Sequence, residues 1–554
     1  MLQWMGWKRR LRIRGWTAIV IVFGLSIYFL ARLGGNDILL SGWRLDSAAA
    51  LPYLDLDWTS QGNDEHPAHP IDGLIANAFR LHQARLAKRT FTVHDGAAAY
   101  RRRHGRHPPP GFDLWYSRAF RANAIIVEDF FDQIYEDLEP FWGVEPEKLR
   151  AALIDWPFTL GVRNGKVLDV PHGFHRSRTW GDGMHSQLAK GLPDLDFAIN
   201  PFDEPRVVVP ADVVDTAMAK ALTQKERMIA QQIPASRLFR ADCQSSSPGP
   251  GSVELLSTFV SNWTASKDVC ANPNFDQLHG ALIEPATLSI TPEFIPIFSS
   301  AKLSTNNDIL LPPPSYYAEE SLFTVKSWFG DAGAKYPWTS KKDGVIWRGK
   351  ATGGTTRVDT WQHFHRHRMV SMLNVSVMES HMDDAFWPTF SAPEKASLIP
   401  VLDNADVAFT DLFCTERMNE AVCQTMSAQY TLAPEVPMAE QFLAFLKSNS
   451  APMKATIFKE WHDDRLEPWV HFIPISIEMK DKWAILSYFL GLDGAVSDHD
   501  RIGGNIAVAG RQWVQKVLRK EDMLIYMHRV LLEFARLTDP NRDNLGYVAD
   551  LKVN

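Results

Sequence analysis

A glycine-rich turn near the middle of the chain carries two arginines and could bind phosphate. Residues 345–357 form a short apolar run that ends at Arg348, followed by Gly353, Gly354 and Arg357. Glycine lets backbone N–H groups approach phosphate oxygens, and arginine binds two such oxygens at once. These residue types therefore indicate a diphosphate site. A structural turn with a surface arginine has the same composition, and the stretch has neither a Walker lysine–serine pair nor a Gly-x-Gly-x-x-Gly pattern.

Two kinds of element, short strands and helices, are expected to alternate along the chain and to position this turn. Short apolar runs are separated by connections of helix length, which is typical of parallel α/β sheets. A stretch rich in Gly, Pro and Lys at residues 330–341 is the best candidate for a hinge, and the periodicity at 511–518 and 523–537 predicts a helical tail. The apolar runs are at residues 207–210, 309–311, 345–347, 407–409, 455–458 and 469–474.

Composition limits the class of protein. With 554 residues and 45% hydrophobic content, the chain is long enough for two ordinary domains. Its formal net charge of −7 excludes a nucleic-acid binder that works by charge. Nineteen tryptophans favour a sugar ligand slightly, because flat aromatic faces suit sugar rings, although tryptophans also build cores.

The N-terminus has the charge pattern of a membrane anchor. Five Lys or Arg residues and no acidic residue occur among residues 1–15, and residues 16–33 are apolar except for Arg32. The basic excess before the span predicts a cytosolic N-terminus and a lumenal remainder, and so short a span suits an early-secretory bilayer. A cleaved signal peptide starts similarly, but no small-x-small cleavage site follows. We therefore predict a cytosolic tail at 1–15, an uncleaved transmembrane helix at 16–33 and a stem at 34–110.

Two further features agree with a lumenal location. Asn262 and Asn374 begin Asn-x-Thr and Asn-x-Ser acceptor sequences for glycans. The four cysteines would be paired in an oxidising lumen, whereas four free thiols would need a reducing compartment. Three connectivities are possible, and local pairing is favoured because short loops close most readily. The predicted bridges are Cys243 to Cys270 and Cys414 to Cys423.

Several motifs, taken in order, resemble those of fungal members of glycosyltransferase family 90. That family contains the capsule-associated CAP10-like proteins and the protein O-glucosyltransferases. The resemblance covers roughly residues 100–551. Its motifs are YRRRHGRHPPPGFD at 100–113, LPDLDFAINPFDEPRV at 192–207, the Trp347-Arg348-Gly349 turn, and EPWVHFIP at 467–474.

The resemblance implies a GT-B fold, in which two Rossmann-like domains face a cleft, and an inverting transfer without a metal. Residues 111–330 would form the acceptor domain and residues 331–554 the nucleotide-sugar domain. Inversion needs a base that takes the proton of the acceptor hydroxyl while the diphosphate leaves. Asp203 occupies the family's base position. Without the resemblance, Asp203 would be interpreted as a turn aspartate before a Glu-Pro pair.

The donor side is assigned by the same resemblance. Arg348 and the glycine turn match the family's donor side and would neutralise the leaving diphosphate, with Arg357 as a second cation. Ser299 and Lys302 match a Phe-Ser-x-x-Lys segment that could line the cleft or merely cap a helix. Glu460 follows an apolar run, where a carboxylate commonly binds ribose hydroxyls. The predicted donor-binding residues are Arg348, Gly349, Gly353, Gly354, Arg357, Ser299, Lys302 and Glu460.

Two patterns could indicate a metal instead. Asp194 and Asp196 form an Asp-x-Asp pair like the metal clamp of GT-A transferases, but three-residue patterns recur by chance and the neighbouring motif resembles a metal-independent family. His363, His365 and His367 alternate with other residues, and in a helix this spacing puts them on different faces. We therefore predict no metal site and expect these histidines at the surface.

The resemblance is interrupted between Gln441 and Phe442. Relatives carry a Lys-Tyr strand, an Asp-x-Asp-Gly turn and a Ser-x-Arg at this point, and these help to hold the nucleotide. The chain has none of them. Either the coding sequence as given has lost a segment, or this is a natural variant with weakened donor binding.

The sequence as a whole predicts a single-pass type II glycosyltransferase of the Golgi or endoplasmic reticulum membrane. It would move xylose or glucose from a UDP-sugar to a hydroxyl of a glycan or protein, with no cofactor and no nucleic-acid partner. The alternative is a non-catalytic relative that binds glycans or acts as a scaffold, and UDP binding would separate the two. A third possibility, a GT-A transferase, would require manganese.

Overall fold

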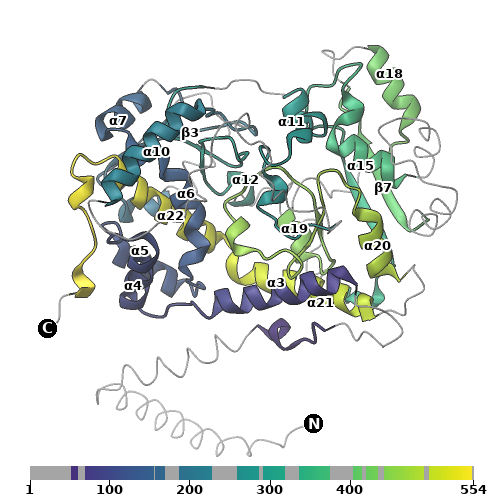
Figure 1. Cartoon of the computed structure of the whole chain (residues 1–554), viewed down its shortest axis with the longest axis horizontal. Helices are drawn as coiled ribbons and strands as arrows, with labels where there is room; N and C mark the ends of the chain where they lie inside the picture. Colours follow the sequence, from purple (N-terminus) through teal and green to yellow (C-terminus); the bar gives the residue numbers. More distant parts are fainter. Residues whose placement is uncertain are drawn as a thin grey trace, which may run out of the picture. The chain divides into compact units, whose positions relative to one another are not determined.

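The computed structural model divides the chain into two compact units, Met1–Leu56 and Asp57–Asn554 (Figure 1). The described part of the first unit contains the 3-10 helix η1 (Pro52–Asp55). No helix among the described residues is both long and apolar enough to cross a membrane. The anchor predicted at 16–33 lies outside them and stays a prediction. The structure describes residues 51–59, 69–154, 156–168, 186–226, 259–285, 291–317, 336–374, 403–414, 420–434, 442–491 and 498–551.

A five-stranded sheet lies in the N-terminal half of the second unit. Its strand order is β2-β1-β3-β4-β5, with β1 antiparallel to both neighbours and β3, β4 and β5 mutually parallel. Four of the five residues of β3 are buried, as expected for a strand covered on both faces. The strands are β1 (Thr159–Arg163), β2 (Lys166–Val167), β3 (Leu195–Ile199), β4 (Ile297–Ser299) and β5 (Ile309–Leu310).

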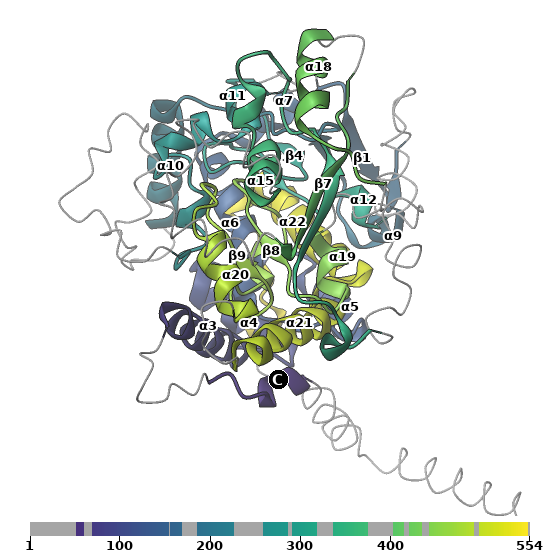
Figure 2. The same ribbon diagram turned by 90° about the vertical axis from the view of Figure 1, so that its right-hand side faces the viewer.

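Two small parallel sheets lie in the C-terminal half. One joins β6 to β7 and the other joins β8 to β9 (Figure 2). Both pack on one hydrophobic cluster, which contains buried Val407 and Phe409 of β7 and is covered by partly buried Met453 of β8. The strands are β6 (Val345–Lys350), β7 (Ala405–Asp411), β8 (Met453–Lys454) and β9 (Ile473–Pro474).

Helices from opposite ends of the chain pack together. Helix α22 (Lys520–Leu537) lies against α5 (Phe112–Arg121), as Figure 1 shows. Arg529 of α22 is fully buried and pairs with Glu128 at 2.6 Å. The N-terminal helices are therefore held by the C-terminal ones, and truncation at either end would expose a buried charge.

Two helices lie within the segment predicted as a stem, residues 34–110. They are α3 (Pro70–Leu86) and α4 (Val93–His104), and both belong to the second compact unit. The apolar stripe of α3 is buried, and Tyr488 donates a hydrogen bond to Asp72 of α3. These helices are part of the folded body rather than of an extended stem.

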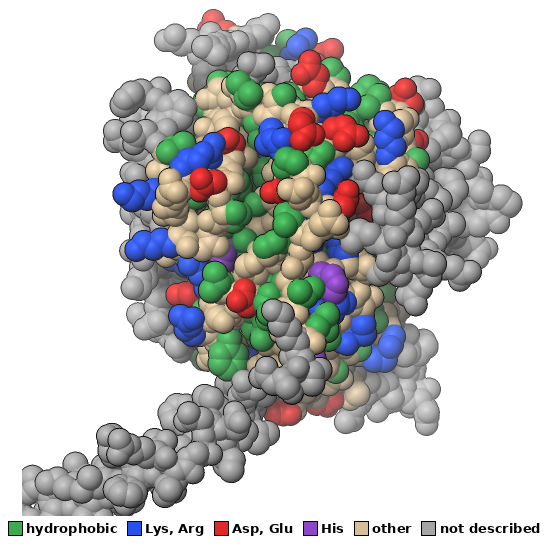
Figure 3. All heavy atoms as spheres, turned by 90° about the vertical axis from the view of Figure 1, so that its left-hand side faces the viewer, with side chains coloured by type: hydrophobic (Ala, Val, Ile, Leu, Met, Phe, Trp, Pro, Cys, Tyr) green, Lys and Arg blue, Asp and Glu red, His purple; other side chains and the backbone are tan. Residues whose placement is uncertain are grey.

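The prediction of a mixed α/β protein is confirmed, whereas the arrangement of two facing Rossmann-like domains stays a prediction. The face turned to the viewer in Figure 3 carries acidic and basic side chains interspersed with hydrophobic ones. The other α-helices are α6 (Asp132–Leu138), α7 (Pro146–Ile154), α9 (Ser186–Leu188), α10 (Ala211–Glu226), α11 (Gly280–Ile283), α12 (Pro314–Tyr317), α15 (His365–Leu373), α18 (Glu420–Gln429), α19 (Phe442–Lys447), α20 (Lys482–Leu490) and α21 (Asp498–Val517).

Candidate active site

The predicted base, Asp203, lies on an exposed loop directly after β3. The side chain of Asn200 holds this loop from inside. Its Nδ2 donates to the carbonyl oxygen of Glu204 at 2.7 Å, and its Oδ1 accepts from the backbone N–H of Phe202 and from Nε of Arg206, both at 3.1 Å. These bonds join Asn200 to residues on both sides of Asp203. They therefore fix the conformation of the loop that carries Asp203.

A buried carboxylate fixes the far end of the same loop. Asp308 is fully buried, and its oxygens accept the backbone N–H groups of Arg206 at 2.9 Å and Val207 at 2.8 Å. It also accepts a hydrogen bond from Ser299 Oγ at 2.6 Å. Burial raises the pKa of Asp308, and its hydrogen bonds and Lys302 oppose that shift. The loop is thereby attached to the ends of the neighbouring parallel strands.

Ser299 and Lys302, predicted to line the cleft, are both only 1% exposed. Lys302 pairs with Asp137 of α6 at 2.5 Å and donates to the carbonyl oxygen of Asp308 at 3.0 Å. Each of their polar groups therefore has a partner within the protein. The two residues support the loop that carries Asp203, which we call the base loop, through Asp308. Their role in lining the cleft stays a prediction.

Lys302 also connects the base loop to the C-terminal half. Its backbone N–H donates to the carbonyl oxygen of Lys459 at 3.1 Å, and the reciprocal bond measures 2.7 Å. Glu460, the predicted ribose ligand, is therefore one residue from this bridge. Its carboxylate accepts a hydrogen bond from Lys454 at 2.9 Å. The structure thus brings Ser299, Lys302 and Glu460 into one region, where the carboxylate of Glu460 is paired with Lys454.

Glu460, His462 and Asp463 could between them offer three metal ligands, whose atoms lie within 4.8 Å of one another. Two ammonium groups are already present, because Lys454 pairs with Glu460 and Lys267 pairs with Asp463. Although burial raises it, these lysine charges hold the pKa of Asp463 below its usual value. A divalent cation here would add charge that nothing compensates, so the geometry favours a buried ion-pair network over a metal site.

Arg348, the main predicted donor cation, is engaged across its own sheet. It is 8% exposed, and its guanidinium pairs with the carboxylate of Asp406 on β7 and donates to the Asp406 carbonyl oxygen at 2.6 Å. Arg357 is more accessible, with its side chain 63% exposed and paired with Glu284 at 3.1 Å. Exposed ion pairs of this kind are weak. Of the two predicted donor-side cations, Arg357 can therefore exchange its partner for a ligand more easily than Arg348 can.

The glycines of the turn are explained by close packing. Gly353 has a φ of +112°, which disfavours any other residue. A Cβ at Gly353 would lie 2.9 Å from the ring of His365, and one at Gly354 would lie 2.8 Å from the ring of Phe364 and 3.0 Å from the Cα of Gly280 in α11. The turn is pressed against α11 and Phe364, so this packing accounts for both glycines without a phosphate. Gly349 follows Arg348 within β6 and is buried.

The prediction that His363, His365 and His367 are surface residues is wrong for His367, which is fully buried. His365 is half-buried, and its ring stacks on His279 with ring centroids 3.9 Å apart. Helix α15 turns one face to the hydrophobic cluster under β7, and His367 lies on that face. Burial lowers the pKa of His367 to about 3, so its ring stays neutral.

Sequence reasoning missed Arg366, which holds the glycine turn in place. Its guanidinium donates to the carbonyl oxygen of Lys350 at 3.2 Å and also bonds the hydroxyl of Thr352. The signal that could have found it is an arginine at the start of a helix that closely follows a glycine turn, since such a helix must fold back along the turn.

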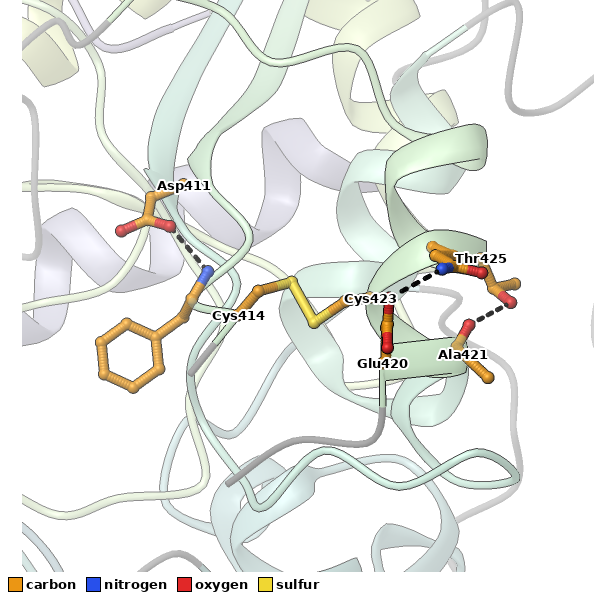
Figure 4. Close-up of a disulfide and its surroundings, with 8 residues drawn as sticks. Asp411, Cys414, Glu420, Ala421, Cys423 and Thr425 are labelled. Atoms are coloured by element: carbon orange, nitrogen blue, oxygen red, sulfur yellow. Dashed lines mark hydrogen bonds between the residues drawn. A yellow bond between two sulfur atoms is a disulfide. The ribbon is translucent and has the colours of Figure 1, made fainter. Parts of the chain in front are cut away.

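The disulfide between Cys414 and Cys423 is confirmed, with a Cα–Cα distance of 5.9 Å. It ties the segment that leaves β7 to α18, as Figure 4 shows. Cys270 is also disulfide-bonded, and Cys243, its predicted partner, lies outside the described residues. Both glycan acceptors, Asn262 and Asn374, lie in described segments, with Asn262 exposed.

The interruption between Gln441 and Phe442 lies next to the ion-pair network. Residues 435–441 are outside the described part, and α19 begins at Phe442. The ring of Phe442 lies 4.2 Å from the ammonium of Lys454 and 5.4 Å from the ring of Phe472. The helix after the interruption is therefore docked on the network that includes Glu460.

Comparison with known proteins finds a similarity for the C-terminal part of the chain. Residues 439–544 match the family described as glycosyl transferase family 90. A segment of 100 residues is 29% identical to protein O-glucosyltransferase 2 of Danio rerio. That segment covers 18% of this chain and 19% of the zebrafish protein, so the likeness spans about a fifth of each.

Proposed function

We propose that this chain, whose residues 439–544 match glycosyl transferase family 90, belongs to that family and transfers a sugar from a UDP-sugar to a hydroxyl group. The family match is the observation that carries the proposal. The similar zebrafish protein is named for transfer of glucose to protein, which makes glucose one candidate donor sugar and a protein hydroxyl one candidate acceptor. Xylose and a glycan acceptor are the other candidates.

In this proposal Asp203 is the general base. Its carboxylate accepts the proton of the acceptor hydroxyl, the hydroxyl oxygen bonds to the anomeric carbon, and the bond to the diphosphate breaks on the opposite side, which inverts the configuration. The exposed position of Asp203 and the bonds that fix its loop support this role. A base must be held in place yet reachable, and this loop meets both conditions.

The donor-side residues divide into two groups. Arg357 can bind a diphosphate by releasing Glu284, a weak surface pair, whereas Arg348 would have to exchange Asp406 for phosphate. Glu460 would have to leave Lys454 to accept from ribose. Donor binding therefore needs rearrangement of existing ion pairs, and we expect it to be weaker than in relatives that carry the segment absent between Gln441 and Phe442.

We also propose the location predicted from the N-terminal residues. The anchor at 16–33 would hold a single-pass type II protein in the Golgi or endoplasmic reticulum membrane. The disulfide between Cys414 and Cys423 supports an oxidising compartment for the folded part.

A second candidate is a relative that binds glycans without transferring sugar. The observation that favours it is the pairing of Arg348 and Glu460 with partners within the chain.

Incubation of the full chain with UDP-glucose or UDP-xylose, with release of UDP as the readout, distinguishes a transferase from a relative that only binds glycans. Asp203→Asn should abolish release and leave UDP binding nearly unchanged. If Asp203→Asn and Arg348→Ala lose UDP binding equally, the roles of Asp203 and Arg348 are assigned wrongly.

A further inference from the structure

An aromatic cluster lies at the carboxyl end of β3, beside the proposed base. Phe202 directly precedes Asp203 and is 41% exposed. Phe158 lies edge-on to it, with ring centroids 6.4 Å apart and ring planes at 80°. Trp156 donates its indole N–H to the carbonyl oxygen of Ile199, the last residue of β3, at 3.1 Å. Open α/β sheets bind ligands beyond the carboxyl ends of their parallel strands, and this cluster occupies such a place.

The ring of Phe202 is held in a defined orientation. The guanidinium of Arg206 covers one face, with its central carbon 4.1 Å from the ring centroid. Nε of Arg206 bonds Asn200, and the backbone N–H of Arg206 bonds Asp308, so the arginine is itself fixed. The exposed part of Phe202 is therefore a rigid apolar surface that loses little conformational freedom when a ligand covers it.

We propose that Phe202 is the stacking surface for a pyranose ring of a carbohydrate acceptor, oriented so that one of its hydroxyls reaches Asp203. The inference rests on the proposed function, because it takes Asp203 as the base. Phe202 and Asp203 are consecutive exposed residues in a bend of the chain, with Cα atoms about 3.8 Å apart, so one sugar ring is large enough to contact both.

The charge beside Phe202 favours a neutral sugar. A phenylalanine offers roughly 200 Å² in all, so 41% exposure leaves less than about 100 Å², an apolar area on the scale of one sugar ring. Two carboxylates, Asp203 and Glu204, follow Phe202 directly. Carboxylates accept hydrogen bonds from sugar hydroxyls and repel anions. A neutral sugar therefore suits this surface.

The experiment measures binding of neutral methyl glycosides of mannose, glucose, galactose and xylose to the full chain by saturation-transfer NMR, without any donor. Phe202→Ala should weaken binding by about tenfold, as expected for loss of one stacked ring. Phe202→Trp should retain it. Phe120→Ala is the matched control, because Phe120 is 40% exposed on α5, and should change nothing. UDP binding should be the same in all variants.

The outcomes keep this inference apart from the proposed function. Glycoside binding that depends on Phe202, together with no UDP release in a separate assay with donor, would support Phe202 as a sugar-stacking surface and refute the transferase. Transfer to a serine-containing peptide that is insensitive to Phe202→Ala would refute the inference and leave the transferase standing. Absence of glycoside binding at millimolar concentration, or equal binding by wild type and Phe202→Ala, also overturns the inference.

Discussion

Replacing Asp308 with asparagine tests whether a buried carboxylate holds the loop of the proposed base. Oδ1 accepts from the Arg206 backbone and from Ser299, and Oδ2 accepts from the Val207 N–H. An asparagine keeps one acceptor oxygen, so its amide group best replaces Oδ2 and leaves the Val207 N–H without an acceptor. An unsatisfied buried donor costs about 1–3 kcal/mol, and this is the expected loss of stability.

Ser299→Ala is the matched control for this prediction. It removes one hydrogen bond to Oδ1, and both oxygens of Asp308 keep a backbone donor. The expected cost is about 1 kcal/mol. Thermal unfolding followed by circular dichroism should rank the melting temperatures as wild type, Ser299→Ala, Asp308→Asn, from highest to lowest. UDP release should fall more in Asp308→Asn than UDP binding does.

Two outcomes would contradict this reasoning. If Asp308→Asn melts at the temperature of Ser299→Ala or above it, the carboxylate does not hold the loop as the hydrogen bonds indicate. If UDP binding and UDP release fall by the same factor, the loop does not act through Asp203.

Three other predictions follow from the chain. Restoring the family's segment between Gln441 and Phe442 should tighten UDP binding at least about tenfold by calorimetry, because each charge-assisted contact adds about 1.5–3 kcal/mol; equal binding would mean that the segment is not needed. Burial, with repulsion from nearby carboxylates, raises the pKa of Asp464 to about 7. The folded state then holds a proton that the unfolded state has released, so stability falls as the pH rises from about 4 to about 7, and Asp464→Asn should melt above wild type near pH 8 but not near pH 4. Glycosidase treatment of protein made in its own secretory pathway should increase mobility through Asn262 or Asn374, and no shift together with protease sensitivity of the C-terminal part in intact microsomes would refute the predicted topology.

Most predicted strands lie near observed ones. The run at 345–347 lies in β6 and the run at 407–409 in β7, while the run at 309–311 overlaps β5. The run at 207–210 is apolar but forms only an isolated bridge, because the N–H of Val207 donates to the Asp308 carboxylate. Hydrophobic periodicity cannot predict that a carboxylate distant in the sequence accepts a backbone hydrogen bond that a neighbouring strand would otherwise accept.

The site was predicted unevenly for a related reason. Ser299 ends β4, and the backbones of Lys302 and Lys459 pair in an isolated bridge, which brings Glu460 near them. The sequence could not show that Lys302 pairs with Asp137 and Glu460 with Lys454. A motif shows which residue types are present. The ion-pair partner of each charged side chain depends instead on which segments of the chain pack together in the fold.

Local features could be predicted from the residues alone: the alternation of apolar runs, the helical tail within α22, the short loop closed by Cys414 and Cys423, and the order of the motifs that resemble family 90. These features depend on residues close together in the chain, where spacing limits the geometry. The pairing of Arg348 with Asp406 and the burial of His367 became known from the folded structure. Both features depend on contacts between elements that are far apart in the sequence. Burial and pairing at these contacts decide whether a charged or polar side chain supports the fold or remains available to a ligand.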